Sequence, residues 1–183
     1  HISMRARRIG GAHARIGGVA DADIDQILAH ARRVQPEILV VDSMQTVTTS
    51  DVASVAGSPQ QVRECAIRAN QFAKATGSCV VLVCQVNKDG QFAGPKMLEH
   101  LVDATLLFEG CVDFPALRYL RAIKNRFGST SERPGCFEMS NDGLHPVASD
   151  PMGEGGDPAP DSLLPVAQEL LYRVLELGGQ VDD

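Results

Sequence analysis

The sequence predicts an α/β protein with a mostly parallel sheet flanked by helices, and three observations point to that class. Two apolar runs, residues 38–41 and 79–86, have the length and β-branched content of strands covered on both faces. A helical pattern lies between them, which gives the strand–helix–strand order of a βαβ unit. Both runs stop at polar residues, and open α/β sheets hold their ligands beyond the carboxyl ends of such strands.

Composition indicates one globular domain without a membrane span. The 183 residues are 44% hydrophobic and 22% charged, and no apolar stretch approaches the roughly 20 residues that cross a bilayer. The five cysteines form no C-x-x-C pair, so neither a zinc site nor a disulfide framework is expected, and reduced thiols in a cytoplasmic protein are predicted. The net charge of −6 provides no general basic field, so any DNA contact would come from local loops.

The first predicted helix covers residues 21–34, with apolar residues at helical spacing and Asp21 or Asp23 as its cap. Pro36 ends it, and the first strand follows. After that strand, residues 48–57 are small, polar and without periodicity. They predict a long loop of the kind that often carries function.

The second predicted helix has clear signals at both ends. Ser58 is a good N-cap, Pro59 suits the first helical position, and Gly77 provides the stop. Its expected apolar stripe consists of Val62, Cys65, Ala66, Ala69 and Ala73. The second strand follows directly and leads into a Gly/Pro loop.

The remaining elements are shorter, and a change in composition follows them. We expect a helical turn at 97–102, a strand at 104–109, an edge-side antiparallel strand at 117–123, and a hairpin of 136–139 with 144–147 around Asn141-Asp142-Gly143. The predicted organisation is therefore a core domain at 1–148, an Asp/Pro/Gly-rich linker at 149–161 and a tail at 162–183. In that tail, residues 162–177 have the pattern of an amphipathic helix.

Two groups of residues have patterns suited to chemistry. Asp42, with Ser43 beside it, stands at the end of a buried strand and suits a Mg²⁺ site, although an acidic turn after a strand is a common structural feature. Lys124 and Arg126 lie two apart, so an extended segment would aim both at one phosphate or oxyanion; a solvated basic turn explains them equally well. Glu99 and Asp103, four apart, fit a solvated helix face better than a catalytic pair.

Several motifs in order resemble a known family. The stretches VVDSMQT, SPQQVRECA, AGPKMLEHLVD and especially KNRFG resemble the bacterial RadA (Sms) DNA-repair proteins, which are RecA-like ATPases. The likeness runs from about Ile2 to Val147 and makes the predicted fold a partial RecA-like core with a C-terminal antiparallel hairpin. It favours a native origin for HISMRARRIGG, although residues 1–3 as the remnant of a tag are the competing view.

The resemblance implies a role for each matching residue. Asp42 looks like the Walker B aspartate, which holds the Mg²⁺ of ATP through water, with Ser43 beside the nucleotide. Gln85 resembles the glutamine that senses the γ-phosphate. Lys124 and Arg126 resemble residues that reach the ATP of a neighbouring subunit, which requires a ring or filament of identical subunits.

The same resemblance implies contacts with single-stranded or branched DNA. Residues 48–57 and 87–96 correspond to DNA-contacting loops in RecA-like assemblies. Lys88 and Lys96 would touch the phosphate backbone, and Arg63 is a weaker candidate because a solvated helix face explains it equally well. Focusing positive charge in a central channel would let an acidic protein bind DNA.

Three parts of the family pattern are missing from these residues. The sequence contains no G-x-x-x-x-G-K-[ST] loop, no four-cysteine zinc module and no match to the Lon-protease-like domain of the family. We therefore expect this chain alone to bind ATP feebly and not to hydrolyse it, and to expose apolar surface that favours aggregation or a partner. Two functions remain open: a fragment of a RadA-type ATPase that drives branch migration of recombination intermediates, or a non-catalytic RecA-like module that assembles with a catalytic partner.

Overall fold

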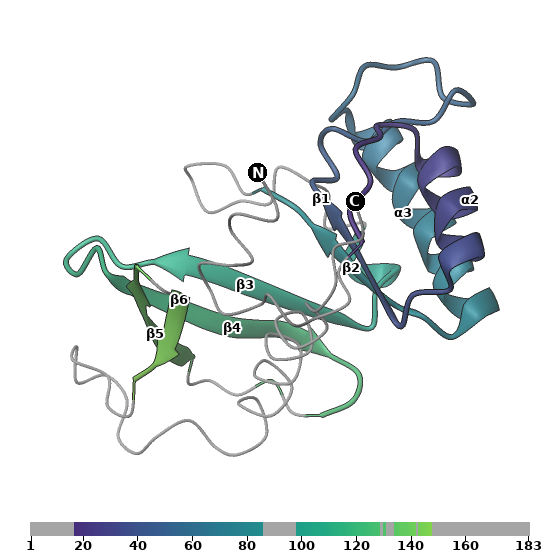
Figure 1. The fold of residues 1–183 in the computed structure, drawn as a ribbon. Coiled ribbons are helices and arrows are strands. Elements are labelled where there is room, and N and C mark those ends of the chain that lie inside the picture. Colours follow the sequence, from purple (N-terminus) through teal and green to yellow (C-terminus); the bar gives the residue numbers. More distant parts are fainter. Residues whose placement is uncertain (1–16, 86–97, 129, 131–133, 142, 148–183) are drawn as a thin grey trace. The chain divides into compact units, whose positions relative to one another are not determined.

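The computed structural model describes residues 17–85, 98–128, 130, 134–141 and 143–147 (Figure 1). Two compact units divide the chain, one of residues 19–102 and one that contains all strands from residue 103 onward, and each is described by itself. The predicted loop lysines Lys88 and Lys96, the linker and the tail helix lie outside the described residues. Among the residues that are described, no helix is long and apolar enough to span a bilayer.

The first unit is a parallel strand pair with two helices. Strand β1 (Ile38–Asp42) pairs in parallel with β2 (Cys79–Val83), and α3 (Pro59–Thr76) connects them in sequence. Helix α2 (Ile24–Val34) precedes β1, and a short 3-10 helix, η2 (Leu98–His100), lies within the predicted turn at 97–102. The predicted strand–helix–strand order and the parallel pairing are confirmed, although β2 ends before the predicted residue 86.

Local capping explains where the two helices begin and end. Helix α2 begins after Asp23, whose carboxylate accepts a hydrogen bond of 2.8 Å from the backbone N–H of Asp25, so Asp23 rather than Asp21 is the cap. Helix α3 has the predicted Ser58 cap, Pro59 in its first turn, and Gly77 at its C-cap with φ of 75°. A left-handed backbone of this kind favours glycine, which is why the helix stops there.

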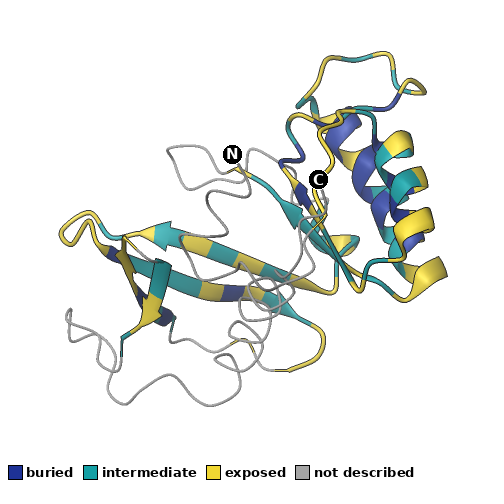
Figure 2. Ribbon diagram, viewed as in Figure 1, coloured by how far each residue is buried: buried dark blue, intermediate teal, exposed yellow. Residues whose placement is uncertain are grey.

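The core of this unit lies where α2 and α3 pack against the strand pair (Figure 2). On α3, Phe72 is fully buried, whereas the predicted stripe residue Ala73 is only half-buried. Both positions lie one turn beyond Ala69, and the larger ring takes the core side. The prediction that β1 is covered on both faces is wrong, because Val41 is buried while Val40 is 44% exposed. An apolar run identifies a strand without showing which of its faces other elements cover.

The second unit is a four-stranded antiparallel sheet in the order β3-β4-β5-β6. Its strands are β3 (Ala104–Gly110), β4 (Leu117–Asn125), β5 (Gly135–Ser140) and β6 (Gly143–Pro146). The predicted strand at 117–123 is not at the edge, because β4 lies between β3 and β5. Its alternation of apolar and basic residues indicated one solvated face, and such a face occurs on central antiparallel strands as well.

Pairing within this sheet contains one irregularity near the carboxyl end of β4. Phe108 pairs with Leu120 and Leu106 with Ala122, but Thr105 then pairs with Lys124 because a bulge shifts the register between Thr105 and Leu106. At the other side of the sheet, Ser140 pairs with Gly143, which confirms the predicted β5–β6 hairpin. The α/β class is therefore confirmed, and the antiparallel sheet contains β3 and β4 in addition to the expected hairpin.

Candidate functional site

The polar residues after β1 and β2 lie at one edge of the parallel pair. Asp42 pairs in register with Val83, and the backbone N–H of Met44 donates a hydrogen bond of 2.9 Å to the carbonyl oxygen of Val83. The chain therefore continues the pairing by one further bond beyond the end of β1. This places Asp42-Ser43 and the segment that leads into Gln85 at the same carboxyl edge, as the sequence predicted.

Asp42 and Ser43 differ sharply in exposure. The Asp42 side chain is exposed, whereas Ser43 is buried, with a cis peptide bond between the two residues. The Ser43 carbonyl oxygen accepts hydrogen bonds from the backbone N–H of Thr46 at 3.0 Å and from its hydroxyl at 2.8 Å. This turn leaves one open carboxylate at the strand tip, which fits a hydrated Mg²⁺ bound through water. In the described part of the chain, no cluster of three His, Cys, Asp or Glu residues forms a closed metal site.

Gln85 is exposed, and its backbone is connected to the turn after β1. The side-chain amide of Gln45 donates a hydrogen bond of 3.3 Å to the carbonyl oxygen of Gln85. The segment that begins at Gln85 is thus joined to the residues that follow Asp42. The sequence reasoning did not single out Gln45.

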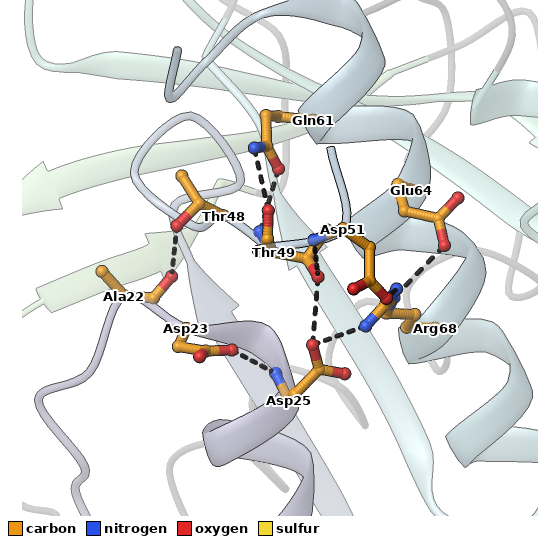
Figure 3. A network of polar contacts seen from close by, with 9 residues as sticks. All are labelled: Ala22, Asp23, Asp25, Thr48, Thr49, Asp51, Gln61, Glu64 and Arg68. Carbon is orange, nitrogen blue, oxygen red and sulfur yellow. Dashed lines mark hydrogen bonds and ion pairs between the residues drawn. The ribbon is translucent and has the colours of Figure 1, made fainter. Parts of the chain in front are cut away.

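The 48–57 loop is held to α3 by the buried side chain of Gln61 (Figure 3). The Thr49 backbone N–H donates to Gln61 Oε1 at 2.9 Å. Gln61 Nε2 in turn donates to the carbonyl oxygens of Thr49 at 3.1 Å, Val52 at 2.8 Å and Ser54 at 3.1 Å. One side chain therefore satisfies backbone groups at three positions along a loop that has no helix or strand of its own.

Arg68 reinforces this arrangement with charge (Figure 3). Its guanidinium contacts Asp25 of α2 and Asp51 of the loop, each at 2.5 Å, and Glu64 one helical turn away at 3.2 Å. The hydrogen bond to Asp51, followed by that to Asp25, raises the pKa of Arg68 above its already high value. Thr49 completes the network, since its hydroxyl donates to Asp25 Oδ2 at 3.0 Å.

The charge around the 48–57 loop bears on what the loop can contact. The loop contains no Lys or Arg, and one guanidinium faces three carboxylates beside it. At the tip, Val55 is 79% exposed. The loop therefore offers no cation to a phosphate, and any phosphate contact by it would come from hydroxyl or backbone N–H groups.

Lys124 and Arg126 belong to the antiparallel unit and do not share one extended segment. Strand β4 ends at Asn125, whose side-chain oxygen accepts a hydrogen bond of 3.0 Å from the backbone N–H of Phe127, so the chain turns there. The prediction that an extended backbone aims both cations the same way is therefore wrong. Lys124 is half-buried, whereas Arg126 is in the turn and its side chain is more than half exposed.

Asp103 holds Arg126 through two contacts. The Arg126 backbone N–H donates to the carbonyl oxygen of Asp103 at 2.9 Å, and its guanidinium contacts the Asp103 carboxylate at 3.0 Å. More than half of each side chain is exposed, so part of the guanidinium still faces solvent. The prediction that Asp103 and Glu99 lie on one solvated helix face is wrong, because η2 ends at His100 and Asp103 directly precedes β3.

Arg63 is exposed on α3, which is compatible both with a DNA contact and with an ordinary solvated helix face. Sequence reasoning missed Gln61, Arg68 and Gln45, and it did not predict the pairing of Asp103 with Arg126. A signal for Gln61 was present, because S-x-x-Q at a helix start is the capping-box pattern. The Gln61 side chain, however, binds the preceding loop instead of the cap.

Comparison with known proteins places these motifs in context. No family model matches the chain. The chain is 43% identical over 148 residues to "DNA repair protein RadA" of Pseudomonas aeruginosa, and 43% identical over 144 residues to that of Bacillus subtilis. These matches cover 81% and 79% of the chain, but the chain spans only about a third of the relatives' own length, 32% and 31%.

Two solved structures are similar in fold. A DnaB-like replicative helicase, described with its interactions with primase, superposes with a TM-score of 0.58 at 11% identity, over 69% of this chain and 36% of that chain. A KaiC-like protein from Pyrococcus horikoshii gives 0.52 at 16% identity, over 68% and 56% respectively. Both neighbours are RecA-like, and at such identities they bear on the fold alone. By sequence over about four fifths of its length, this chain is a RadA-like protein with a RecA-like fold.

Proposed function

We propose that this chain is part of a RadA-type ATPase that acts on DNA in recombination repair, driving branch migration of recombination intermediates. The observation that carries the proposal is the shared edge of β1 and β2, where the exposed Asp42 lies on one strand and Gln85 follows the other. An ATPase of this kind needs a Mg²⁺-binding carboxylate and a group that responds to the terminal phosphate. The sequence similarity to RadA proteins supports the assignment.

The residues at this edge would have different roles in binding ATP and Mg²⁺. Asp42 would hold the hydrated Mg²⁺ of ATP with Ser43 beside it, and Gln85 would respond to the γ-phosphate. Bound Mg²⁺ would neutralise charge on the phosphates during transfer. Because the 183 residues lack a G-x-x-x-x-G-K-[ST] loop, we expect the chain alone to bind ATP·Mg²⁺ weakly and not to hydrolyse it. Isothermal titration that gave micromolar affinity would contradict this expectation.

DNA would be contacted by separate groups of residues. Lys88, Lys96 and, less strongly, Arg63 would meet phosphates of single-stranded or branched DNA. The 48–57 loop carries no cation, so it would contribute hydroxyl and backbone N–H groups and the exposed Val55 to the contact. The chain should therefore bind DNA with a salt dependence set by the few lysines and arginines rather than by this loop.

Lys124 and Arg126 would act on the nucleotide of a neighbouring subunit in a ring or filament. The Arg126 side chain is more than half exposed although Asp103 contacts its guanidinium and its backbone N–H, and this exposure supports a role toward a neighbouring subunit. A positive group supplied by the next subunit stabilises charge that develops on the phosphates.

A hybrid protein tests this assignment. In it, this chain replaces the matching segment of the Bacillus subtilis relative, which spans 144 residues of this chain. Lys124→Ala should abolish DNA-stimulated ATPase while leaving ATP binding nearly intact, and Arg121→Ala, which removes an exposed cation of the same strand, should leave both unchanged. Lost nucleotide binding with retained DNA stimulation would show that Lys124 acts within its own subunit.

Mixing two defective hybrids tests action between subunits. One carries Lys124→Ala, and the other carries an alanine at the lysine of its phosphate-binding loop. If Lys124 acts on the neighbouring nucleotide, mixed assemblies regain part of the activity. If the mixture stays as inactive as either variant alone, the role between subunits is refuted.

The alternative is a non-catalytic RecA-like module that assembles with a catalytic partner and lends Lys124 and Arg126 to it. The observation that favours it is the missing phosphate-binding loop in these residues together with an outward-facing Arg126. A pull-down of a RadA relative by this chain, lost with Arg126→Ala but kept with Arg121→Ala, would favour the module.

A further inference from the structure

Gln45 lies between the end of the 48–57 loop and Gln85, which follows β2. Its side-chain amide donates to the carbonyl oxygen of Gln85, from which the 87–96 segment continues. Its backbone carbonyl faces Gly57, the last residue of the 48–57 loop: a Cβ added at Gly57 would lie 3.1 Å from that oxygen. The backbone of Gln45 therefore lies beside the end of the 48–57 loop, and its side chain bonds to Gln85 after the end of β2.

Gly57 is fixed in place from both sides of the chain. Its φ of 75° is a left-handed conformation that favours glycine, and the next residue, Ser58, donates a backbone hydrogen bond of 3.1 Å to the carbonyl oxygen of Val55. The Ser58 side chain then caps α3. A shift of the loop end would therefore also move the cap of α3, and a side chain at Gly57 would press on the Gln45 carbonyl.

Of the two polar atoms of the Gln45 side-chain amide, only the nitrogen has a hydrogen-bond partner among the described residues. Its Nε2 has the bond to Gln85, whereas Oε1 is buried without a hydrogen-bond partner in the part of the chain that the structure describes. A buried amide oxygen without a donor is unusual in a folded protein. Among the described residues, the Gln85 carbonyl therefore provides the hydrogen bond that restrains the Gln45 side chain. We expect this side chain to move when the end of β2 moves.

We propose that Gln45 is a positioning residue that joins the 48–57 loop to the end of β2, so that a displacement of one reaches the other. The purpose of the coupling rests on the proposed function, in which Gln85 responds to nucleotide and both loops contact DNA. Through Gln45, a change at Gln85 would reach the 48–57 loop. The coupling itself is a property of this chain and needs neither ligand.

A double-substitution experiment on the 183-residue chain tests the coupling. Gly57→Ala is the perturbation, because the new methyl group must displace the Gln45 carbonyl. The readout is the chemical shift of the Gln85 carbonyl carbon, measured by NMR without nucleotide or DNA, because this carbonyl accepts the Gln45 hydrogen bond. Gly57→Ala should move that resonance toward its position in Gln45→Leu, in which the bond is absent.

The background at position 45 separates coupling from a general disturbance. In a chain that already carries Gln45→Leu, adding Gly57→Ala should leave the Gln85 resonance in place, since the connecting amide is gone. Gln71→Leu, at an exposed position of α3, is the matched background in which the full shift should persist. If Gly57→Ala prevents folding, Gly57→Asn supplies the same Cβ with better tolerance of a left-handed backbone.

Two results would overturn the proposal. One is an equal shift at Gln85 with and without the Gln45→Leu substitution, and the other is no shift when Gln45 is present. DNA binding is measured separately on the unsubstituted chain by fluorescence anisotropy. A chain that fails to bind DNA but retains the coupling would refute the DNA role of the loops and leave the role of Gln45 standing.

Discussion

The buried amide of Gln61 allows a sharp test of how the 48–57 loop is held. Gln61→Leu keeps nearly the same side-chain volume but removes four hydrogen bonds, one accepted from Thr49 and three donated to loop carbonyls. Gln61 is only 2% exposed, so water cannot readily replace the lost partners without opening the loop. We expect the variant to fold with a destabilised loop.

The size of the effect follows from these contacts. A typical hydrogen bond contributes about 1 kcal/mol net, and a buried group left without a partner costs about 1–3 kcal/mol. The two amide hydrogens of Nε2 are shared among three carbonyl oxygens, so the four contacts count as about three bonds. With some gain from burying leucine, we expect the free energy of unfolding to fall by about 2–4 kcal/mol.

Urea unfolding measures the global change, and NMR hydrogen exchange measures the loop. The Thr49 backbone amide donates to Gln61 Oε1, so its exchange should become at least about tenfold faster in Gln61→Leu. Gln60→Leu is the matched control, because Gln60 is exposed on the same helix and should change stability by less than about 0.5 kcal/mol. If the two variants unfold alike and Thr49 stays protected, the loop is held by something other than Gln61.

Three further predictions concern the same unit. Arg68→Met should lower the free energy of unfolding by about 2 kcal/mol in low salt, and by less in high salt because salt screens its ion pairs. Arg63→Met, at an exposed position, should change the free energy of unfolding little. A loss of stability in Arg68→Met that is the same in low and high salt would refute the electrostatic reasoning. Burial raises the pKa of the Cys65 thiol from 9.0 to about 11. The stability that this shift contributes is fully present below pH 9 and is lost as pH rises from 9 toward 11, because the thiol of the unfolded chain deprotonates first. Urea unfolding should show a fall of roughly 2–3 kcal/mol over that range in the unsubstituted chain, beyond any fall in Cys65→Ala, whereas parallel curves would contradict the assignment. Ser58→Ala should cost about 1 kcal/mol by removing the cap of α3, and Ser58→Asp should retain most of that stability in the same assay.

Local signals in the sequence predicted the elements of this fold well. Ser58, Pro59 and Gly77 each determine backbone geometry or a cap at their own position, so their meaning does not depend on distant residues. The parallel pairing of β1 and β2 also followed, because two apolar runs separated by a helix have few alternative arrangements. The predictions failed where a residue's environment is set by contacts far along the chain, as with the position of β4 within its sheet.

In the candidate site, too, local signals predicted some residues, whereas residues defined by distant contacts were missed. Asp42 and Gln85 were predictable because each lies at or just after the end of a strand, and parallel strands end at one edge. Arg68 was not, since a residue on a polar helix face becomes a partner for Asp25 and Asp51 only when the fold brings them together across 43 and 17 positions. The contact of Gln45 with Gln85 and that of Asp103 with Arg126 were missed for the same reason, because they span 40 and 23 positions.

The bulge between β3 and β4 gives this strand an unusual tolerance to losing a residue. Opposite residues of antiparallel strands share a face, and the surplus residue lets Lys124 pair with Thr105 instead of Ala104. Loss of one residue inside a regular strand turns every later side chain to the other surface of the sheet. Deleting Ile123 would instead remove only the surplus residue and leave Lys124 opposite Thr105. Relatives that are one residue shorter at this point could therefore present the KNRFG lysine on the same surface.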